Sequence, residues 1–300
     1  MAIPASILEI WSNQGAIKTP KSLREKIENK LTNSQSKIQY KNTLDIYLQG
    51  SYRNSTNIYG NSDVDIVVQS DSTFFSDISE LDAYETAIYK RAFSEATYTW
   101  KDFKKEVIET LEESFGEKNV EVGNKSIKID DGSYEADVVP CFEYRKYISF
   151  GENDDEREYI PGIKFYTTNE NRTVINYPKE HYSKGSSKNQ RASMKYKPTI
   201  RIFKNMKKKL IEKGMINKEQ APSYFVENLL YNVPDKYFDD TSITSRVYQV
   251  IKWLQENRYS LSQFICQNEQ VYLFGYSQEQ WKEVDAREFI NQLIALWNEW

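Results

Sequence analysis

The feature that most constrains this chain is the segment LQGSYRNSTNIYGNSDVDIVV at residues 48–68. It holds a Gly-Ser pair, a polar insert, and then two aspartates at the start of a β-branched apolar run. Aspartate is depleted in strands, so two aspartates separated by one valine need a reason. Because strand side chains alternate between faces, Asp63 and Asp65 point the same way, and their carboxylates repel unless a cation lies between them.

A third carboxylate comes from the later β-rich run YEADVVPC at residues 134–141. If that strand lies beside the first, Asp137 faces the aspartate pair, and Glu135 shares its face as a weaker candidate. Mg²⁺ prefers oxygen ligands and is commonly bound by carboxylates together with substrate phosphates. We therefore predict a site for two Mg²⁺ ions, with Mn²⁺ as an alternative, held by Asp63, Asp65 and Asp137.

The Gly50-Ser51 pair makes this interpretation stronger than Asp-x-Asp alone, which is usually a solvated strand end. Glycine lets the backbone approach a phosphate, and serine offers a hydroxyl and its own N–H. A Gly-Ser turn, an Asp-x-Asp strand and a further strand aspartate together favour a triphosphate clamp beside two metal ions. The polar insert then joins the phosphate-holding turn to the metal-holding strand.

Composition excludes several other kinds of protein. The 300 residues include one histidine and two cysteines, which disfavours Ser-His-Asp and Cys-His catalysis, Cys-ligated zinc and a disulfide framework. A formal net charge of −4 argues against coating nucleic acid by bulk electrostatics. No apolar stretch is long enough to cross a membrane and no leader pattern is visible, so we expect a cytoplasmic protein without a membrane partner.

Periodicity predicts an α+β chain in two parts. Helical patterning covers residues 4–34 and 76–115, the run LDIYLQ at 44–49 fits a strand or a helix end, and short extended runs follow residue 116. The polar segment SKGSSKNQ at 183–190 reads as a loop and a hinge, which divides the chain into domains 1–190 and 191–300. Further helices are expected at about 195–215, 222–232, 242–257 and 284–299.

On these motifs the chain resembles a nucleotidyltransferase of the polymerase-β-like superfamily, whose signature is Gly-Ser, Asp-x-Asp and a third acid on a later strand. More narrowly, it resembles the CD-NTases, the bacterial relatives of cyclic GMP-AMP synthase and oligoadenylate synthase. The resemblance implies a nucleotidyltransferase core with a mixed sheet, followed by a helical C-terminal domain that closes the nucleotide groove. It is carried, in family order, by WSNQGA (11–16), QGSYRNSTNIYGNSDVDIVV (49–68), ADVVPCFEYR (136–145), YKPTIRIFKNMK (196–207) and SYFVENLLYNVP (223–234).

The resemblance also implies roles for individual residues. Lys204 and Ser223 match residues that contact donor phosphates, and Tyr224 matches a tyrosine that stacks on a base. Two alternatives stay open: Lys204 could share one solvated helix face with the lysines at 207–209, and Tyr224 could be a core residue. The implied nucleotide-binding residues are Gln49, Gly50, Ser51, Lys204, Ser223 and Tyr224.

The function implied by the resemblance is synthesis of a cyclic di- or oligonucleotide second messenger from NTPs, ATP among them, in antiphage signalling. The enzyme is expected to act as a monomer, without an obligatory nucleic acid, and to signal to an effector protein through its product. One alternative is a nucleotidyltransferase that modifies RNA, a protein or a small molecule; another is a non-catalytic nucleotide-binding relative. Candidate base-reading residues, left unranked, are Thr167, Thr168 and Asn169.

Overall fold

A computed structural model describes the chain except for residues 1, 16–17, 61–63 and 133. It divides into two compact units whose segments interleave along the chain. The sheet unit comprises Ile17–Gln49 and Asp63–Lys179, and the helical unit comprises Met1–Ala16, Gly50–Ser62 and Glu180–Trp300. This division differs from the single boundary at residue 190 expected from the sequence. The reason is that residues shortly after Gly50 form hydrogen bonds with residues of the C-terminal helices.

The sheet unit is built on one mixed seven-stranded sheet. Its strand order is β1-β2-β5-β4-β3, and β6 pairs with both β5 and β7. β2 and β5 run parallel, and the other pairings are antiparallel. The elements of this unit are α2 (Lys18–Thr32), β1 (Leu44–Leu48), β2 (Val64–Asp77), α4 (Ala83–Ala92), α5 (Trp100–Phe115), β3 (Val120–Val122), β4 (Ile127–Asp130), β5 (Glu135–Ser149), β6 (Glu158–Tyr166) and β7 (Thr173–Asn176).

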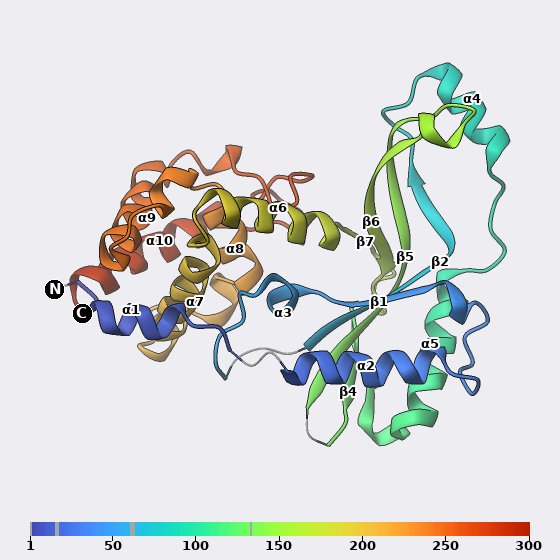
Figure 1. The fold of residues 1–300 in the computed structure, drawn as a ribbon, viewed down its shortest axis with the longest axis horizontal. Helices are drawn as coiled ribbons and strands as arrows, with labels where there is room; N and C mark the ends of the chain where they lie inside the picture. Colours follow the sequence, from blue (N-terminus) through green and yellow to red (C-terminus); the bar gives the residue numbers. More distant parts are fainter. Residues whose placement is uncertain (1, 16–17, 61–63, 133) are drawn as a thin grey trace. The chain divides into compact units, whose positions relative to one another are not determined.

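Helices α2 and α5 lie against one face of this sheet, as Figure 1 shows. α5 begins at a capping box in which Thr99 and Asp102 exchange hydrogen bonds, and it ends at Gly116, whose φ of 89° suits a glycine. Phe103 of α5 stacks on Phe142 of β5, with ring centroids 5.5 Å apart. The apolar stripe of α5 therefore buries the face of β5 that carries Phe142.

β2 continues as a strand to Asp77, so the helical patterning assigned to residues 76–115 was wrong at its beginning. Two helices follow, α4 and α5, separated by residues 93–99. The far ends of β2, β5 and β6 extend together and carry α4 (Figure 1). An aromatic cluster at this end includes Tyr147 and Phe150, which are almost fully buried. Burial of these large rings stabilises the extended ends of the strands, a feature that local periodicity does not identify.

The helical unit has a separate core formed mainly by the C-terminal helices. The four helices predicted after residue 195 are confirmed, with ends within about three residues of those expected. Each turns an apolar stripe inward, which is why periodicity identified them. The elements of this unit are α1 (Ala5–Ser12), α3 (Gly50–Asn54), α6 (Pro178–Arg191), α7 (Tyr196–Glu212), α8 (Ser223–Tyr231), α9 (Ile243–Asn257) and α10 (Glu283–Asn298). The first two residues of α6 belong to the sheet unit, and the helical unit begins at Glu180.

The expected loop at residues 183–190 is wrong, because this segment lies inside helix α6. A Cβ on Gly185 would come within 2.2 Å of the Gln267 amide, so the glycine serves close packing. Lys188 is buried and donates to Asp235 Oδ1 at 2.6 Å and to the Val233 carbonyl at 2.8 Å. Partners far away in sequence thus stabilise a helix whose composition resembles a loop.

The two cysteines lie in different units, Cys141 in β5 and Cys266 in the helical unit, and both thiols are free and buried. Burial raises the pKa of Cys141 well above its ordinary value. Burial also raises the pKa of Cys266, to about 11. Over the described residues, no helix is both long and apolar enough to span a bilayer.

Candidate active site

The sheet unit brings two of the three predicted aspartates together. Asp65 of β2 and Asp137 of β5 are register partners on neighbouring parallel strands. Neighbouring strands lie about 4.8 Å apart, and register partners point to the same face. Both residues are half-buried, and Ser126 Oγ donates to Asp137 Oδ1 at 2.9 Å. The adjacency expected for these two strands is therefore confirmed.

Asp63 lies outside the described residues, so its predicted role as a metal ligand stays a prediction. No group of three metal-ligating side chains occurs within the described part of the chain. Asp65 and Asp137 fit a hard cation for two reasons. Their carboxylates are oxygen ligands, and a cation between them would relieve the repulsion between two negative charges. Glu135 has another partner: its carboxylate lies 2.7 Å from Lys128 Nζ at the exposed strand end.

The residues around the Gly-Ser pair are placed by backbone contacts. Gln49 N–H donates to the Asp65 carbonyl at 2.9 Å, which fixes the end of β1 beside the aspartate strand. Gly50 begins α3 with φ of 62°, a conformation that favours glycine. Thr56 N–H donates to the Ser51 carbonyl at 2.9 Å and closes the turn that follows. Local conformation thus requires glycine at the first position of the pair.

Lys204 is buried rather than solvated, which excludes the solvated-face alternative for this lysine. It is 3% exposed, and its ammonium group donates to the carboxylate of Glu227 and to Thr56 Oγ1 at 3.2 Å. Thr56 in turn donates to Glu227 Oε1 at 2.7 Å. Its expected contact with a donor phosphate stays a prediction. The structure adds a second role: Lys204 compensates a buried carboxylate and connects Thr56 to α7 and α8.

Burial alone would raise the pKa of Glu227, but the charge of Lys204 and the nearby His181 oppose it and hold that pKa at about 2. His181 Nε2 lies 3.6 Å from Glu227 Oε2, too far for a hydrogen bond. The imidazole is 5% exposed, and neither ring nitrogen has a hydrogen-bond partner among the described residues. Glu227 therefore carries its negative charge throughout the neutral range.

Lys207 is the residue that sequence reasoning missed. It is 5% exposed, lies one helical turn beyond Lys204, and donates from Nζ to Ser223 Oγ at 3.0 Å. No carboxylate partner is recorded for it over the described residues. Burial, with the positive charges of Lys204 and Lys218, lowers the pKa of Lys207 to about 8. An ammonium paired with only a hydroxyl is suited to attract an anion.

Tyr224 follows Ser223 on α8 and is 37% exposed. Its ring stacks on His181, with centroids 5.4 Å apart and planes 25° apart. Its neighbour Phe225 stacks on Trp281 of the helical core, with centroids 5.6 Å apart. Phe225 is therefore half-buried against the core of the helical unit, whereas Tyr224 is the more exposed residue of the pair.

The three candidate base-reading residues have unlike surroundings in the sheet unit. Thr167 is buried, and its hydroxyl accepts from Arg172 N–H at 2.9 Å. Thr168 is exposed, and its hydroxyl donates to the Gly123 carbonyl at 2.7 Å. Asn169 is also exposed, and its backbone N–H donates to the Asn124 side chain at 3.0 Å. The Asn169 side chain is thus more accessible than the Thr167 hydroxyl.

Three comparisons with known proteins agree on the class of this chain. Residues 183–298 match the family model for the cGAS/DncV-like nucleotidyltransferase C-terminal helical domain. Cyclic nucleotide synthase CdnE01 of Staphylococcus haemolyticus is 60% identical, over 100% of both chains. The cyclic UMP-AMP synthase of Rhodothermus marinus is 45% identical, over 100% of this chain and 99% of its own.

Solved structures give the same answer for the fold. The Rhodothermus marinus CdnE c-UMP-AMP synthase, solved with Apcpp and Upnpp, superposes with a TM-score of 0.87 at 44% identity and covers 99% of this chain and 97% of its own. The Elizabethkingia meningoseptica CdnE cyclic dinucleotide synthase, solved with GTP and Apcpp, gives 0.78 at 29% identity over 99% and 98%.

The mixed sheet with a helical C-terminal region and these relatives define a nucleotidyltransferase. The chain belongs to the CD-NTase family. The predicted fold class and family are therefore confirmed, while the roles of individual site residues stay predictions.

Proposed function

We propose that the protein synthesises a cyclic di- or oligonucleotide from NTPs. The carrying observation is the register pairing of Asp65 with Asp137, in a chain 60% identical to a protein named a cyclic nucleotide synthase. Two aspartates side by side on parallel strands would supply two of the carboxylates of a nucleotidyl-transfer site. Relatives named for cyclic UMP-AMP and cyclic dipurine products support a cyclic product.

The proposed reaction joins two NTPs and then closes a ring. A ribose hydroxyl of one nucleotide attacks the α-phosphorus of the other, pyrophosphate leaves, and a second transfer within the linear intermediate releases a second pyrophosphate. Asp63, Asp65 and Asp137 would hold two Mg²⁺ ions, which when bound lower the pKa of the attacking hydroxyl and neutralise charge on the departing pyrophosphate. Asp137 would also accept the proton of that hydroxyl.

The donor nucleotide would be held by the Gly-Ser segment and by residues of α7 and α8. Gly50 and Ser51 would offer a closely approaching backbone and a hydroxyl to the triphosphate, with Gln49 beside them. Ser223 would contact the donor phosphates together with Lys204, and we add Lys207 because its ammonium already reaches the Ser223 hydroxyl. Tyr224 would stack on a base, an interaction worth about 1–3 kcal/mol.

The biological role follows from the product class. A cyclic dinucleotide is a diffusible second messenger, so we propose an effector protein that responds to it, in antiphage defence. We propose ATP as one substrate, in line with the ATP analogue Apcpp in two similar structures. The mass of the product identifies the second base.

The first test is incubation of purified, nuclease-treated protein with Mg²⁺ and the four NTPs. We expect a phosphatase-resistant small product by mass spectrometry, without added DNA or RNA, because a net charge of −4 opposes approach to a polynucleotide. Transfer of a nucleotide to a protein or an RNA, in place of a small product, would favour the RNA- or protein-modifying alternative. Absence of any product would favour a nucleotide-binding relative, and activity only with duplex DNA or RNA would show that the charge balance was misread.

A second test uses the pH dependence of the reaction to examine Lys207. Its pKa of about 8 means that the ammonium is charged below pH 8 and neutral above it. We expect kcat/KM for NTP to fall about tenfold per pH unit above pH 8, because this ratio reports groups of the free enzyme. Lys207→Arg, which stays charged, should remove this fall. Lys207→Met should lower kcat/KM below pH 8, and its difference from wild type should shrink as the pH rises above 8.

The matched control for this test is Lys209→Met. Lys209 lies on the same helix, but it is half-buried and 3.2 Å from Glu212. This variant should keep the wild-type pH profile. An unchanged profile in Lys207→Arg would show that Lys207 is not the titrating group and would withdraw it from the donor site.

A further inference from the structure

The sheet unit holds a cavity of about 570 Å³ that the proposed chemistry does not use. This volume is within the range of small-molecule pockets. It lies where the middle of β5 meets the beginning of α5 and the end of β6. Six aromatic rings line it: Phe74, Phe75, Tyr98, Trp100, Phe142 and Tyr166.

This cavity is separate from the aspartate pair. Phe142 lies five residues beyond Asp137 on β5, which places it roughly 16 Å along the strand. An odd separation puts the two side chains on opposite faces of the sheet. Phe142 stacks on Phe103 of α5, so the cavity opens on the helix-covered face and the carboxylates on the other. A ligand in this cavity would not reach Asp65 or Asp137.

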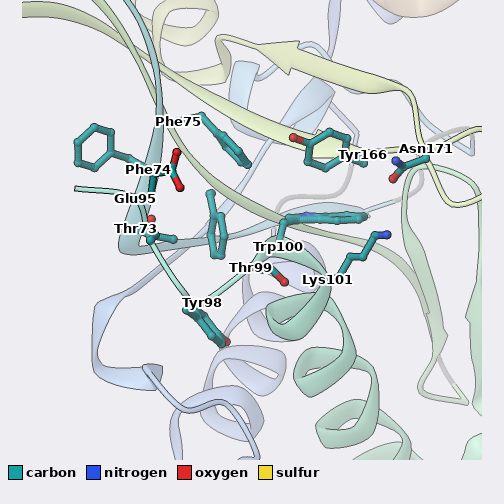
Figure 2. Close-up of a pocket in the computed structure, with 12 residues that line it drawn as sticks. Thr73, Phe74, Phe75, Glu95, Tyr98, Thr99, Trp100, Lys101, Tyr166 and Asn171 are labelled. Atoms are coloured by element: carbon teal, nitrogen blue, oxygen red, sulfur yellow. The ribbon is translucent and has the colours of Figure 1, made fainter. Parts of the chain in front are cut away.

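The rings of the cavity are held in place by contacts of their own. Trp100 Nε1 donates to the Pro140 carbonyl at 2.9 Å, which fixes the indole. Tyr166 lies 5.4 Å from Trp100 between ring centroids, and Phe75 lies 6.0 Å from Tyr166. Figure 2 shows Tyr166 above Trp100, with Phe75 beside them. Fixed aromatic walls offer stacking surfaces to a planar ring at little cost in conformational entropy.

Polar groups lie at the two ends of this aromatic wall. Lys101 and Asn171 lie at one end of Trp100, and Thr73 and Glu95 lie at the other side of the cavity near Phe74 (Figure 2). The Asn171 amide can both donate and accept a hydrogen bond, and the Glu95 carboxylate accepts from an amino group. A heteroaromatic ring with exocyclic donors and acceptors therefore suits this cavity better than a hydrocarbon.

Lysines lie at two places along this wall. Lys164 Nζ lies 4.3 Å from the centre of the Phe75 ring and 5.8 Å from that of Tyr166, and other lysines lie at the Lys101 end. An adjoining cavity of about 620 Å³ shares Trp100, Lys101 and Asn171. It is also lined by Lys104, Lys105, Glu109 and Glu112, and by the candidate base-reading residues Thr167 and Thr168. Lys104 Nζ lies 5.1 Å from the centre of the Trp100 ring, and Lys105 lies 3.7 Å from Glu109. Lys101 is exposed and has no ion pair among the described residues. Its charge is available to an anionic group next to the aromatic wall.

We propose that this cavity is a second nucleotide site, which binds a nucleoside monophosphate away from the catalytic aspartates. The base lies against the ring wall of Phe75, Trp100 and Tyr166, and the phosphate is directed toward Lys101. Stacking contributes to binding of any base, and the phosphate adds an attraction that a free nucleoside lacks. The inference concerns binding alone and does not depend on the cyclic product.

The test is calorimetric titration of the whole protein with AMP in the absence of Mg²⁺. We expect one AMP per chain and binding about tenfold weaker for adenosine, with no detectable heat from inorganic phosphate alone. Lys101→Ala should weaken AMP binding about tenfold, and Lys105→Ala, the neighbouring lysine paired with Glu109, should leave it within about twofold. Ala96→Trp adds an indole from an exposed position on the cavity wall and should abolish binding.

A second measurement does not depend on how the variants fold. Wild-type protein is illuminated with 8-azido-AMP and digested, and the label is located by mass spectrometry. We expect label on the peptides that carry Trp100 or Tyr166, and competition by unlabelled AMP. Label only elsewhere, AMP binding unchanged in folded Ala96→Trp, or no AMP binding at about 1 mM would each overturn the proposal. Product formation from NTPs is assayed separately, so failure here is distinguishable from failure of the proposed function.

Discussion

The double variant Asp65→Asn with Asp137→Asn is expected to lose product formation by about a thousandfold or more while it stays folded. Asparagine keeps the shape of aspartate, and its oxygen can still accept the hydrogen bond from Ser126. What the variant loses is the negative charge that would hold Mg²⁺ at this place. Because like charges on register partners destabilise a sheet, the metal-free variant should unfold at the wild-type temperature or slightly above it.

Product yield by mass spectrometry and thermal unfolding by circular dichroism check this prediction together. Glu135→Gln is the matched control, because Glu135 lies on the same strand and its carboxylate is paired with Lys128. The control should retain activity within about threefold. Wild-type product yield from the double variant would end the assignment of these aspartates to the metal site.

The second large effect concerns stability. Lys204→Met is expected to lower the free energy of unfolding by about 3–5 kcal/mol, because it leaves the buried Glu227 carboxylate without its cation. The double variant Lys204→Met with Glu227→Met should recover much of this loss, since it removes the unpaired charge as well. Lys208→Met, at a half-buried lysine on the same helix, serves as the control and should stay near wild type. Urea unfolding midpoints measure all three.

The pH dependence of stability gives an independent check. The folded-state pKa of Glu227, about 2, lies below the value near 4.3 of an unfolded chain. The stabilisation from this carboxylate is thus fully present above about pH 4.3 and is lost as the pH falls toward 2. Without Lys204, burial instead raises this pKa, so acidification neutralises the group at less cost. The gap between wild type and Lys204→Met should therefore shrink as the pH falls; a gap that is constant from pH 7 to pH 4 would contradict the pairing.

The burial of Lys204 and its ion pair with Glu227 revise the expectation that the sequence attached to this residue. A lysine assigned only to substrate phosphates would affect nucleotide use more than folding. The structure gives Lys204 partners 23 and 148 residues away in sequence, Glu227 and Thr56. No local pattern reveals such a pair, because a buried ion pair and a solvated lysine stripe have the same sequence until the fold brings the acid into place.

Patterns that depend on chemistry and on short-range periodicity were readable without a structure. If the two strands are neighbours, the alternation of side chains predicts that Asp137 and Asp65 lie on the same face of the sheet. The register confirms that they are partners. Amphipathic stripes identified α7 to α10 for the same reason. The polar helix α6 was missed because its stabilising partners, such as Gln267 and Asp235, lie outside any local window.

The two compact units were also beyond the reach of local patterns. Residues 50–60 follow β1 in sequence, yet they belong to the helical unit, where Thr56 and Asn54 form hydrogen bonds with Glu227. Contacts between residues more than 170 positions apart decide this assignment. The linear order of helix, sheet and helix suggests one boundary, whereas the chain passes between its units several times.

The placement of the two cysteines makes the native protein its own probe of local opening. A thiol-reactive reagent attacks only a thiolate that it can reach, and burial with a raised pKa protects both Cys141 and Cys266. Each unit holds one of them. The rate at which each cysteine becomes labelled therefore measures how often its own unit opens, and peptide mapping separates the two rates. A wild-type chain without added labels can thus show which unit NTPs protect.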